Sequence, residues 1–306
     1  YDALGLLGHA CGHNFIGTAS TFAGIALASV MKELPGTLMV FGTPAEENLG
    51  GKIIMHENGA FKGVDAAMMV HPSNETRIQA RTLAVQVLEF EFRGKPAHAA
   101  ASPWAGVNAL DALIQMFVSV DQMRKQMKPT VRIPGIITYG GERTNVVPER
   151  AVGQFSCRGA DLEEANYVIM RVKRCAEAAA LATGCTYTCA EIGRMYYDIR
   201  PSRTLVDLFT KNWLKIGGVI DENPDKGQGS LDIGNLSYDF PCVHPSICIA
   251  PQNVATHTKE FADCARAPRA DEQLLQSIRA LALTALDIYL HPDLFRKMKE
   301  ENSARL

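Results

Sequence analysis

A cysteine and two histidines lie close together near the start of the chain, in the segment GHACGHN at residues 8–14. Cys11 and His13 are two residues apart, on a loop that glycines keep tight, so a thiolate and an imidazole can converge on one cation. Small loops of this kind are common in zinc sites. A buried cysteine beside surface or capping histidines is the alternative interpretation, and both stay open at this point.

Two adjacent carboxylates, Glu46 and Glu47, follow a short apolar run at residues 37–41 that predicts a strand buried on both faces. At the carboxyl end of a strand they would face the crevice in which open α/β sheets bind ligands. One carboxylate can then coordinate a metal while its neighbour takes a proton from water. An acidic pair on a surface loop is the alternative.

Two further histidines occupy comparable places. His71 ends the next apolar run, at residues 66–70, and His257 lies far along the chain, just after an expected strand end. Each is weak evidence alone, because a histidine at a strand terminus is usually structural. Together with the cysteine loop and the acidic pair, they predict a cluster of metal ligands at successive carboxyl ends of strands.

The elements that would position these residues follow a regular order. Apolar side chains at helical spacing predict a helix over residues 14–34, which Pro35-Gly36 ends. The strand at 37–41, a helical stretch at 52–57 and a strand at 66–70 come next. This alternation is typical of a mixed or parallel sheet with helices on its faces.

The pattern changes after residue 77. Residues 82–93 alternate between apolar and polar side chains, as in a half-exposed antiparallel strand. Beyond them the sequence predicts a helix at 108–127, strands at 133–138 and 151–157, and a helix at 162–183 that Gly184 caps. Two helices on one face of an antiparallel sheet form a separate α+β unit.

Helices at 202–215 and 271–290 and a strand at 243–249 then return to the first pattern. We therefore expect residues 80–193 to be an insertion between two parts, 1–79 and 194–306, of one α/β domain.

Composition limits the function classes. The chain has 306 residues, a formal net charge of −2 and a pI near 6.5, so no basic surface for a nucleic acid is expected. No apolar run is long enough for a membrane helix. The eight cysteines form no CxxC pair, and apart from Cys11 we interpret them as reduced, mostly buried thiols of a cytoplasmic protein.

Seven motifs spread over essentially the whole chain resemble the aminoacylase and aminobenzoyl-glutamate hydrolase family of two-metal metallopeptidases. They are YDAL (1–4), GHACGHN (8–14), PAEE (44–47), VHP (70–72), GKPAHAA (94–100), TNVVP (144–148) and THT (256–258). The segments GSLDIGNLS (229–237) and ALATGC (180–185) look most like the Xaa-Arg or β-alanyl-lysine dipeptidases of that family.

The resemblance implies a role for each matching residue. Glu46 matches the general base, and Asp2 matches an acidic residue behind the metal site that orients ligands. His98 and Asn145 match residues of an inserted, ferredoxin-like lid that reach a substrate in the partner's active site, and this lid forms a homodimer. His9 matches a position that is not a ligand. The matches to ligands of two divalent metals are Cys11, His13, Glu47, His71 and His257.

The chemistry implied is hydrolysis of an amide bond. Two ions lower the pKa of a bridging water and polarise the carbonyl, while Glu46 moves the proton to the leaving amine. His98 could hydrogen-bond the developing oxyanion when the lid closes. The thiolate of Cys11 suits zinc, but the family also uses manganese or cobalt.

Two features depart from the family pattern. The chain begins at Tyr1 without an initiator Met, and family members carry a further segment before the matching position. We interpret the chain as a processed product or a fragment, and expect it to be less stable than a full-length relative because strand edges and helix faces lose their cover. Leu231 stands where close relatives usually have Thr.

The leading hypothesis is a metal-dependent hydrolase of small dipeptides with a basic C-terminal residue. A neighbouring hypothesis keeps the mechanism but takes an N-acyl or aminobenzoyl amino acid. A third uses Cys11 as a nucleophile with His13 as its base. The fourth is a truncated, inactive family member that only dimerises through its lid.

Overall fold

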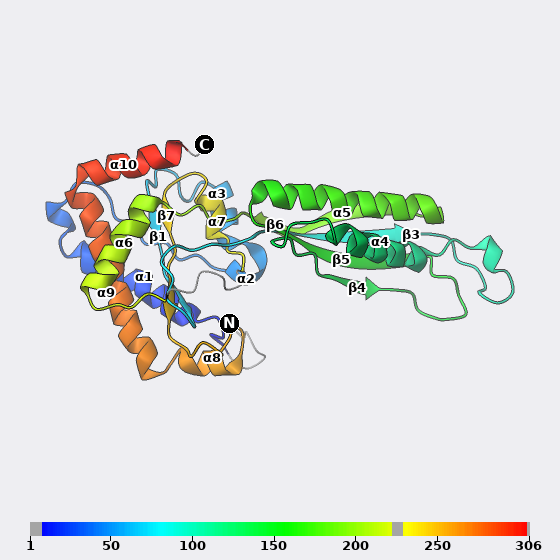
Figure 1. The fold of residues 1–306 in the computed structure, drawn as a ribbon, viewed down its shortest axis with the longest axis horizontal. Helices are drawn as coiled ribbons and strands as arrows, with labels where there is room; N and C mark the ends of the chain where they lie inside the picture. Colours follow the sequence, from blue (N-terminus) through cyan, green and yellow to red (C-terminus); the bar gives the residue numbers. More distant parts are fainter. Residues whose placement is uncertain (1–7, 222–228, 305–306) are drawn as a thin grey trace.

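The computed structural model describes residues 8–221 and 229–304, which form an elongated molecule with two lobes (Figure 1). One lobe contains the beginning and the end of the described chain, from α1 (His13–Ala28) to α10 (Pro292–Ser303). The other lobe consists of the middle of the chain. After the domains that the sequence resemblance implies, we call the first the catalytic lobe and the second the lid.

The catalytic lobe is held by parallel pairing of segments that are far apart in the sequence. β1 (Ala67–Met68) pairs with β7 (Cys242–Val243), and β2 (His71–Ser73) pairs with β8 (Ser246–Cys248). Helices surround these short strands: η1 (Met31–Glu33), α2 (Glu46–Leu49), α3 (Gly51–Glu57), α6 (Arg203–Lys215), α7 (Ile233–Leu236), α8 (Lys259–Cys264) and α9 (Pro268–Leu290), besides α1 and α10.

The largest apolar core of this lobe joins helices to the second strand pair. Phe15 of α1, Trp213 of α6 and Ile247 of β8 are almost fully buried in one cluster with Phe261 of α8. Removing such side chains from water is the main favourable contribution to folding. The core therefore fixes α1 and β2, the two elements that carry the first histidines of the site.

The run at residues 37–41, which the sequence predicts as a buried strand, pairs with no other strand in the described part of the chain. That prediction is wrong. A strand forms only where a neighbour supplies ladder partners, and here the carbonyl of Thr37 instead accepts a hydrogen bond from the Tyr289 hydroxyl at 2.8 Å. Met39 and Val40 are about half exposed, at 54% and 51%.

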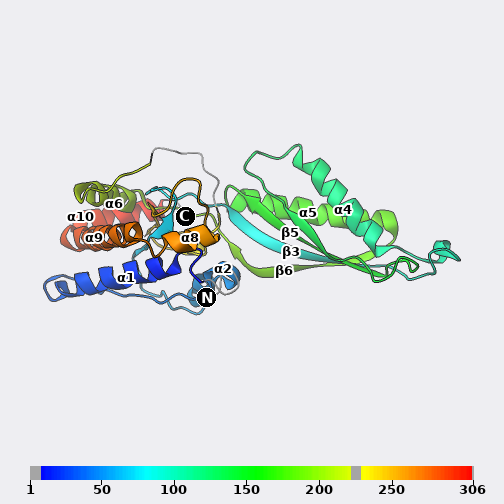
Figure 2. The same cartoon turned by 90° about the horizontal axis from the view of Figure 1, so that it is seen from below.

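The lid is a four-stranded antiparallel sheet in the order β4-β5-β3-β6. Its helices α4 (Ala109–Arg124) and α5 (Leu162–Thr183) lie on one face of the sheet (Figure 2). The remaining elements are β3 (Ala84–Arg93), η2 (Pro103–Ala105), β4 (Gly135–Tyr139), β5 (Arg150–Gly159) and β6 (Thr186–Tyr196).

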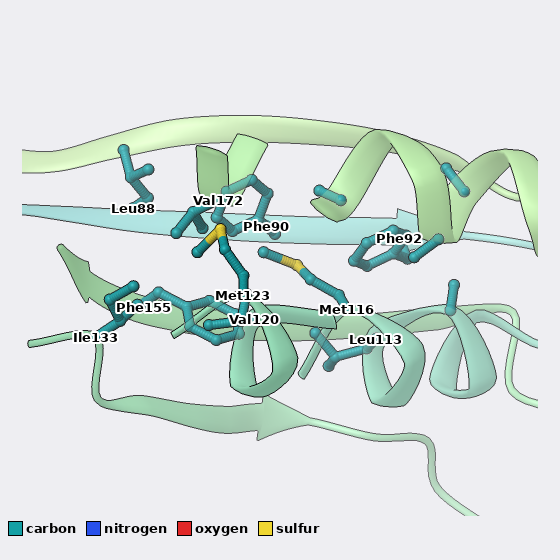
Figure 3. Packing of buried hydrophobic residues seen from close by; sticks show 14 of the residues in the cluster. Leu88, Phe90, Phe92, Leu113, Met116, Val120, Met123, Ile133, Phe155 and Val172 are labelled. Atoms are coloured by element: carbon teal, nitrogen blue, oxygen red, sulfur yellow. The ribbon is translucent and has the colours of Figure 1, made fainter. Parts of the chain in front are cut away.

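A single apolar cluster joins this sheet to both helices (Figure 3). Phe90 and Phe92 alternate with polar residues along β3 and face Leu113 and Met116 of α4. The same period-two pattern in the sequence predicted β3. Because β3 pairs with β5 over its whole length, the register of the sheet is strongly specified.

The structure confirms the fold class expected from the sequence, an α/β domain with an inserted α+β unit. α5 begins and ends where predicted, with Asp161 capping its first turn and Gly184 in the left-handed conformation after its last. β6 was not predicted from the sequence, although threonine and tyrosine alternate at its start.

None of the described helices is long and apolar enough to cross a membrane. All eight cysteines are free thiols.

Candidate metal centre

The cysteine loop, residues 8–12, packs against β2. Gly12 is the N-cap of α1 and has a φ of 74°, a left-handed conformation that favours glycine. A Cβ at this position would lie 2.4 Å from the ring of Pro72, so only glycine fits. The close approach places Cys11 beside the strand residue His71, whose Nε2 is 3.4 Å from the Cys11 Sγ.

His71 presents that nitrogen to the site because its other nitrogen is occupied. Nδ1 lies 2.7 Å from the carbonyl oxygen of Pro72, to which it donates, and this leaves Nε2 with a lone pair toward Cys11. Burial lowers the pKa of His71 to about 4, so the ring is neutral at physiological pH. A neutral imidazole is the form that binds a metal.

The acidic pair begins α2, directly after Ala45, which is itself left-handed with a φ of 61°. The Glu47 carboxylate lies between two imidazoles: its Oε1 is 3.4 Å from Nε2 of His13 and 3.4 Å from Nε2 of His257. Glu47 therefore connects the beginning of the chain to its distant C-terminal part.

His257 reaches this place from a loop before α8. Its φ is 66°, and its backbone N–H donates to the carbonyl of Ala10 at 2.7 Å, which ties the loop directly to the cysteine loop. Thr258 then caps α8 through its hydroxyl. His9, Ala45 and His257 are the non-glycine residues with positive φ in the described chain, and all three lie in loops of the site.

The five expected ligands and Glu46 form overlapping groups. In each group the donor atoms lie within 4.8 Å of one another. The groups are Cys11, His13 and His71; Cys11, Glu47 and His257; and His13, Glu46 and Glu47. Cys11, His13 and Glu47 each belong to two groups, which suits two adjacent cations. A mixed set of sulfur, nitrogen and oxygen donors suits zinc or a similar divalent metal.

The two carboxylates have opposite electrostatic environments. Burial, with nearby Asp232 and Glu47, raises the pKa of Glu46 to about 7. A hydrogen bond with His13 lowers the pKa of Glu47 to about 2 despite partial burial. Such a division separates a carboxyl that can exchange a proton near neutral pH from one that stays ionised as a ligand.

Burial and the neighbouring carboxylates raise the pKa of the Cys11 thiol well above its usual range. A cysteine nucleophile needs a lowered pKa, and the imidazole in hydrogen-bond contact with the Cys11 sulfur is that of His71. This environment argues against the hypothesis of Cys11 as a nucleophile.

The chain is similar to known peptidases over most of its length. Residues 86–183 match the family described as a peptidase dimerisation domain. The whole chain is 37% identical to Xaa-Arg dipeptidase of Mus musculus and 35% identical to that of Homo sapiens, and it spans 72% of the length of each. The chain belongs to the M20 family of metallopeptidases.

Solved structures show the same fold. A putative aminohydrolase from Staphylococcus aureus superposes with a TM-score of 0.74 at 20% identity, over 92% of this chain and 74% of the other. A dinuclear metal-binding M20 peptidase from Bacillus subtilis has a TM-score of 0.65 at 18% identity, over 91% of this chain and 73% of the other. These structures show the M20 arrangement of a catalytic and a dimerisation domain. The similarity to the Xaa-Arg dipeptidases shows that the chain is a hydrolase.

The residues expected to contact substrate lie elsewhere in this M20 chain. His98 and Asn145 are both exposed in the lid and are neighbours there, since the N–H of Ala99 donates to the Asn145 carbonyl at 3.0 Å. Neither lines the cavity around the metal ligands. Asp2 lies outside the described residues. His9 is exposed and belongs to none of the ligand groups.

Sequence reasoning missed several polar residues of the site. A cavity of about 730 Å³ between the lobes is lined by the acidic pair, Arg158 and Tyr196 among others. Behind Glu46, the almost fully buried Lys52 and Asp232 form an ion pair with an N–O distance of 2.9 Å. Asp232 belongs to the GSLDIGNLS segment, so its motif was noticed but its role was not.

Proposed function

We propose that this chain hydrolyses the amide bond of small dipeptides with a basic C-terminal residue, with two divalent metal ions and Glu46 as the general base. The observation that carries the proposal is the convergence of six predicted residues, from four separate segments, into overlapping ligand groups. The preference for a basic residue is supported by the similarity to the Xaa-Arg dipeptidases.

Each protein group then has a distinct part. Two ions held by the five ligands would polarise the scissile carbonyl and make water more acidic. Glu46 takes a proton from the attacking water and passes it to the leaving amine, and a pKa near 7 suits both steps. Zinc suits the thiolate best, and manganese or cobalt are also compatible with the imidazole and carboxylate ligands.

The position of Arg158 favours a substrate with a free carboxylate. Its side chain lines the cavity and donates to the Ser230 hydroxyl at 2.9 Å, and no carboxylate of the described residues forms an ion pair with it. Burial lowers its pKa, which reflects the cost of keeping this charge partly away from water. A planar guanidinium in that position fits a carboxylate with two hydrogen bonds.

The lid has a second part in the proposal. His98 and Asn145 face solvent on the lid of their own chain, and a partner bound through the lid could bring them to the active site. The match to a peptidase dimerisation domain supports a homodimer of this kind. We further propose that the lid spans residues 80–193 and the catalytic domain 1–79 and 194–306. Eight free thiols support a cytoplasmic location.

Metal analysis and a substrate panel test the proposal. The purified chain is loaded with zinc, manganese or cobalt, its metal content is measured, and hydrolysis of Xaa-Arg, β-alanyl-lysine and Xaa-Ala dipeptides is followed. We expect about two metals per chain, faster cleavage of the basic dipeptides, and loss of activity with EDTA that added metal restores. A chain that takes up no metal contradicts the proposal.

An acyl amino-acid amidohydrolase is the second candidate. The specific observation in its favour is 35% identity to a p-aminobenzoyl-glutamate hydrolase polypeptide of Escherichia coli, over 65% of this chain and 42% of that one. N-acetyl amino acids and aminobenzoyl-glutamate in the same panel discriminate between the two. Preference for these substrates keeps the mechanism but changes the substrate class.

A further inference from the structure

The segment that carries Glu46 is a short and intrinsically weak helix. α2 has four residues and lies between two left-handed residues, Ala45 and Gly50. A helix of this length has too few hydrogen bonds to be stable alone. The orientation of the Glu46 side chain must therefore depend on contacts from other elements.

One such contact comes from the lid. The hydroxyl of Tyr196, the last residue of β6, donates a hydrogen bond to the backbone carbonyl of Glu46 at 2.5 Å. Its ring lies directly on Gly50, where an added Cβ would be 2.9 Å from the ring edge. Burial raises the pKa of Tyr196 to about 12, so the hydroxyl keeps its proton and remains a donor.

The same strand end contacts the next helix as well. Arg194 forms two hydrogen bonds with the Glu57 carboxylate of α3, at 2.8 and 3.1 Å. β6 is in turn paired with β3 from Val85 to Arg93, so its end is part of the lid sheet. From the opposite side, Asp232 accepts from the backbone N–H of Lys52 at 2.9 Å and holds α3 to the catalytic lobe.

We propose that Tyr196 is a positioning residue through which the lid sets the orientation of Glu46. The β6 end and α2 form one unit, so a movement of the lid is transmitted to the base through a single hydrogen bond and a ring contact. This coupling rests on the proposed function only in assigning the base to Glu46. The hydroxyl is bonded to the backbone carbonyl of Glu46, so it acts on the base through the backbone of α2.

The substitution Tyr196→Phe removes the hydroxyl and keeps the ring on Gly50. We expect kcat to fall roughly tenfold, because a small displacement of a catalytic group is costly, while KM and metal content stay unchanged. Hydrogen exchange should accelerate at the amides of Leu49 and Gly51, which donate to Ala45, but not in α1.

Tyr187→Phe is the matched control, because Tyr187 lies on the same strand and packs on Phe92 in the lid core. It should change neither the kinetics nor exchange in α2. Unchanged kcat and exchange in Tyr196→Phe would overturn the proposal. So would loss of metal or faster exchange throughout the catalytic lobe, because the hydroxyl would then support the fold and not the base.

Hydrogen exchange also separates this inference from the proposed function. If the metal-loaded wild-type chain cleaves no dipeptide, the proposed function fails. The exchange rates of residues 44–53 in the two variants still decide whether Tyr196 holds α2.

Discussion

The lid and the catalytic lobe are organised in opposite ways. In the lid, two of the paired strands have ten residues and match over their full length, and one cluster of neighbouring apolar residues forms the core. In the catalytic lobe, the paired strands have two or three residues and join segments that precede and follow the lid in the sequence. The lid is stabilised mainly by apolar packing, whereas the site depends on left-handed loops, polar contacts and ligands.

Substitutions of the acidic pair, Glu46 and Glu47, should have the largest effect on activity and should show that the two carboxylates have different roles. Glu46→Gln keeps the shape of the site but cannot take a proton from water, so kcat should fall by about a thousandfold or more with both metals retained. Glu47→Gln removes the negative charge of a proposed metal ligand, so metal should be lost. Metal content and kcat of the two variants, measured side by side, test this.

Equal loss of metal from both variants would contradict the assigned roles. Glu89→Gln is a suitable control, since this carboxylate belongs to the lid, where its hydrogen bond is to Gln154. It should change neither quantity.

The elements of the lid were predicted from the sequence more accurately than those of the catalytic lobe, with β6 as the exception. Local periodicity predicted α5 to the residue, and the close spacing of Cys11 and His13 was a visible signal. β6 was missed because most of its residues are exposed, so the strand carries little of the apolar alternation that identified β3. The run at 37–41 was predicted as a strand because its residues are apolar. Its composition does not tell whether another strand lies beside it to form the hydrogen bonds.

The candidate site shows the same limit. The places of His71 and His257 were expected from strand ends, but only the fold shows that His257 bonds to Ala10 beside the cysteine. Lys52 and Asp232 could not be paired from the sequence, because a lysine and an aspartate in separate segments carry no signal of mutual burial. Tyr196 was missed for the same reason, since it acts from the lid on the backbone of another lobe.

Breaking the buried ion pair between Lys52 and Asp232 should have the largest effect on the free energy of unfolding. Lys52→Met leaves Asp232, which has no exposed surface, as an unpaired buried charge, at a cost of about 3–5 kcal/mol. The exposed pair of Lys299 and Asp65 is the control, and Lys299→Met should cost under about 1 kcal/mol. Urea unfolding measures both free energies.

The double variant Lys52→Met with Asp232→Leu sharpens the same test. Because it removes both charges, it should recover part of the loss. Equal destabilisation by the buried and exposed variants would mean that the catalytic lobe does not depend on this pair.

Metal removal should destabilise one lobe and not the other. An ion that binds only the folded state adds about 2.7 kcal/mol when its free concentration is a hundred times its Kd. Trp213 is buried in the catalytic lobe and Trp104 is exposed in the lid, so a Trp104→Phe background makes fluorescence report the catalytic lobe. Hydrogen exchange of α4 and α5 reports the lid.

In that background, EDTA should lower the unfolding midpoint seen by Trp213, while exchange in the lid helices stays constant. Equal changes in both lobes would show that they unfold as one cooperative unit. The contrast between them would then be one of architecture and not of stability.

Alanine substitutions at two glycines of the same backbone conformation, one in each lobe, should have the smallest effects of those proposed. Gly12 in the cysteine loop and Gly184 after α5 have φ values of 74° and 76°. An alanine at Gly184 meets open space, so it suffers only the conformational cost, about 1 kcal/mol. An alanine at Gly12 meets the same cost and also the ring of Pro72 at 2.4 Å.

Gly12→Ala should therefore displace Cys11 from His71, weaken metal binding and destabilise the catalytic lobe by more than Gly184→Ala destabilises the lid. Metal titration and urea unfolding of the two variants measure the difference. Because the backbone strain is the same at both positions, any excess in Gly12→Ala reports the contact between the cysteine loop and β2. Equal losses with unchanged metal affinity would mean that the loop can move away from Pro72 without disturbing the ligands.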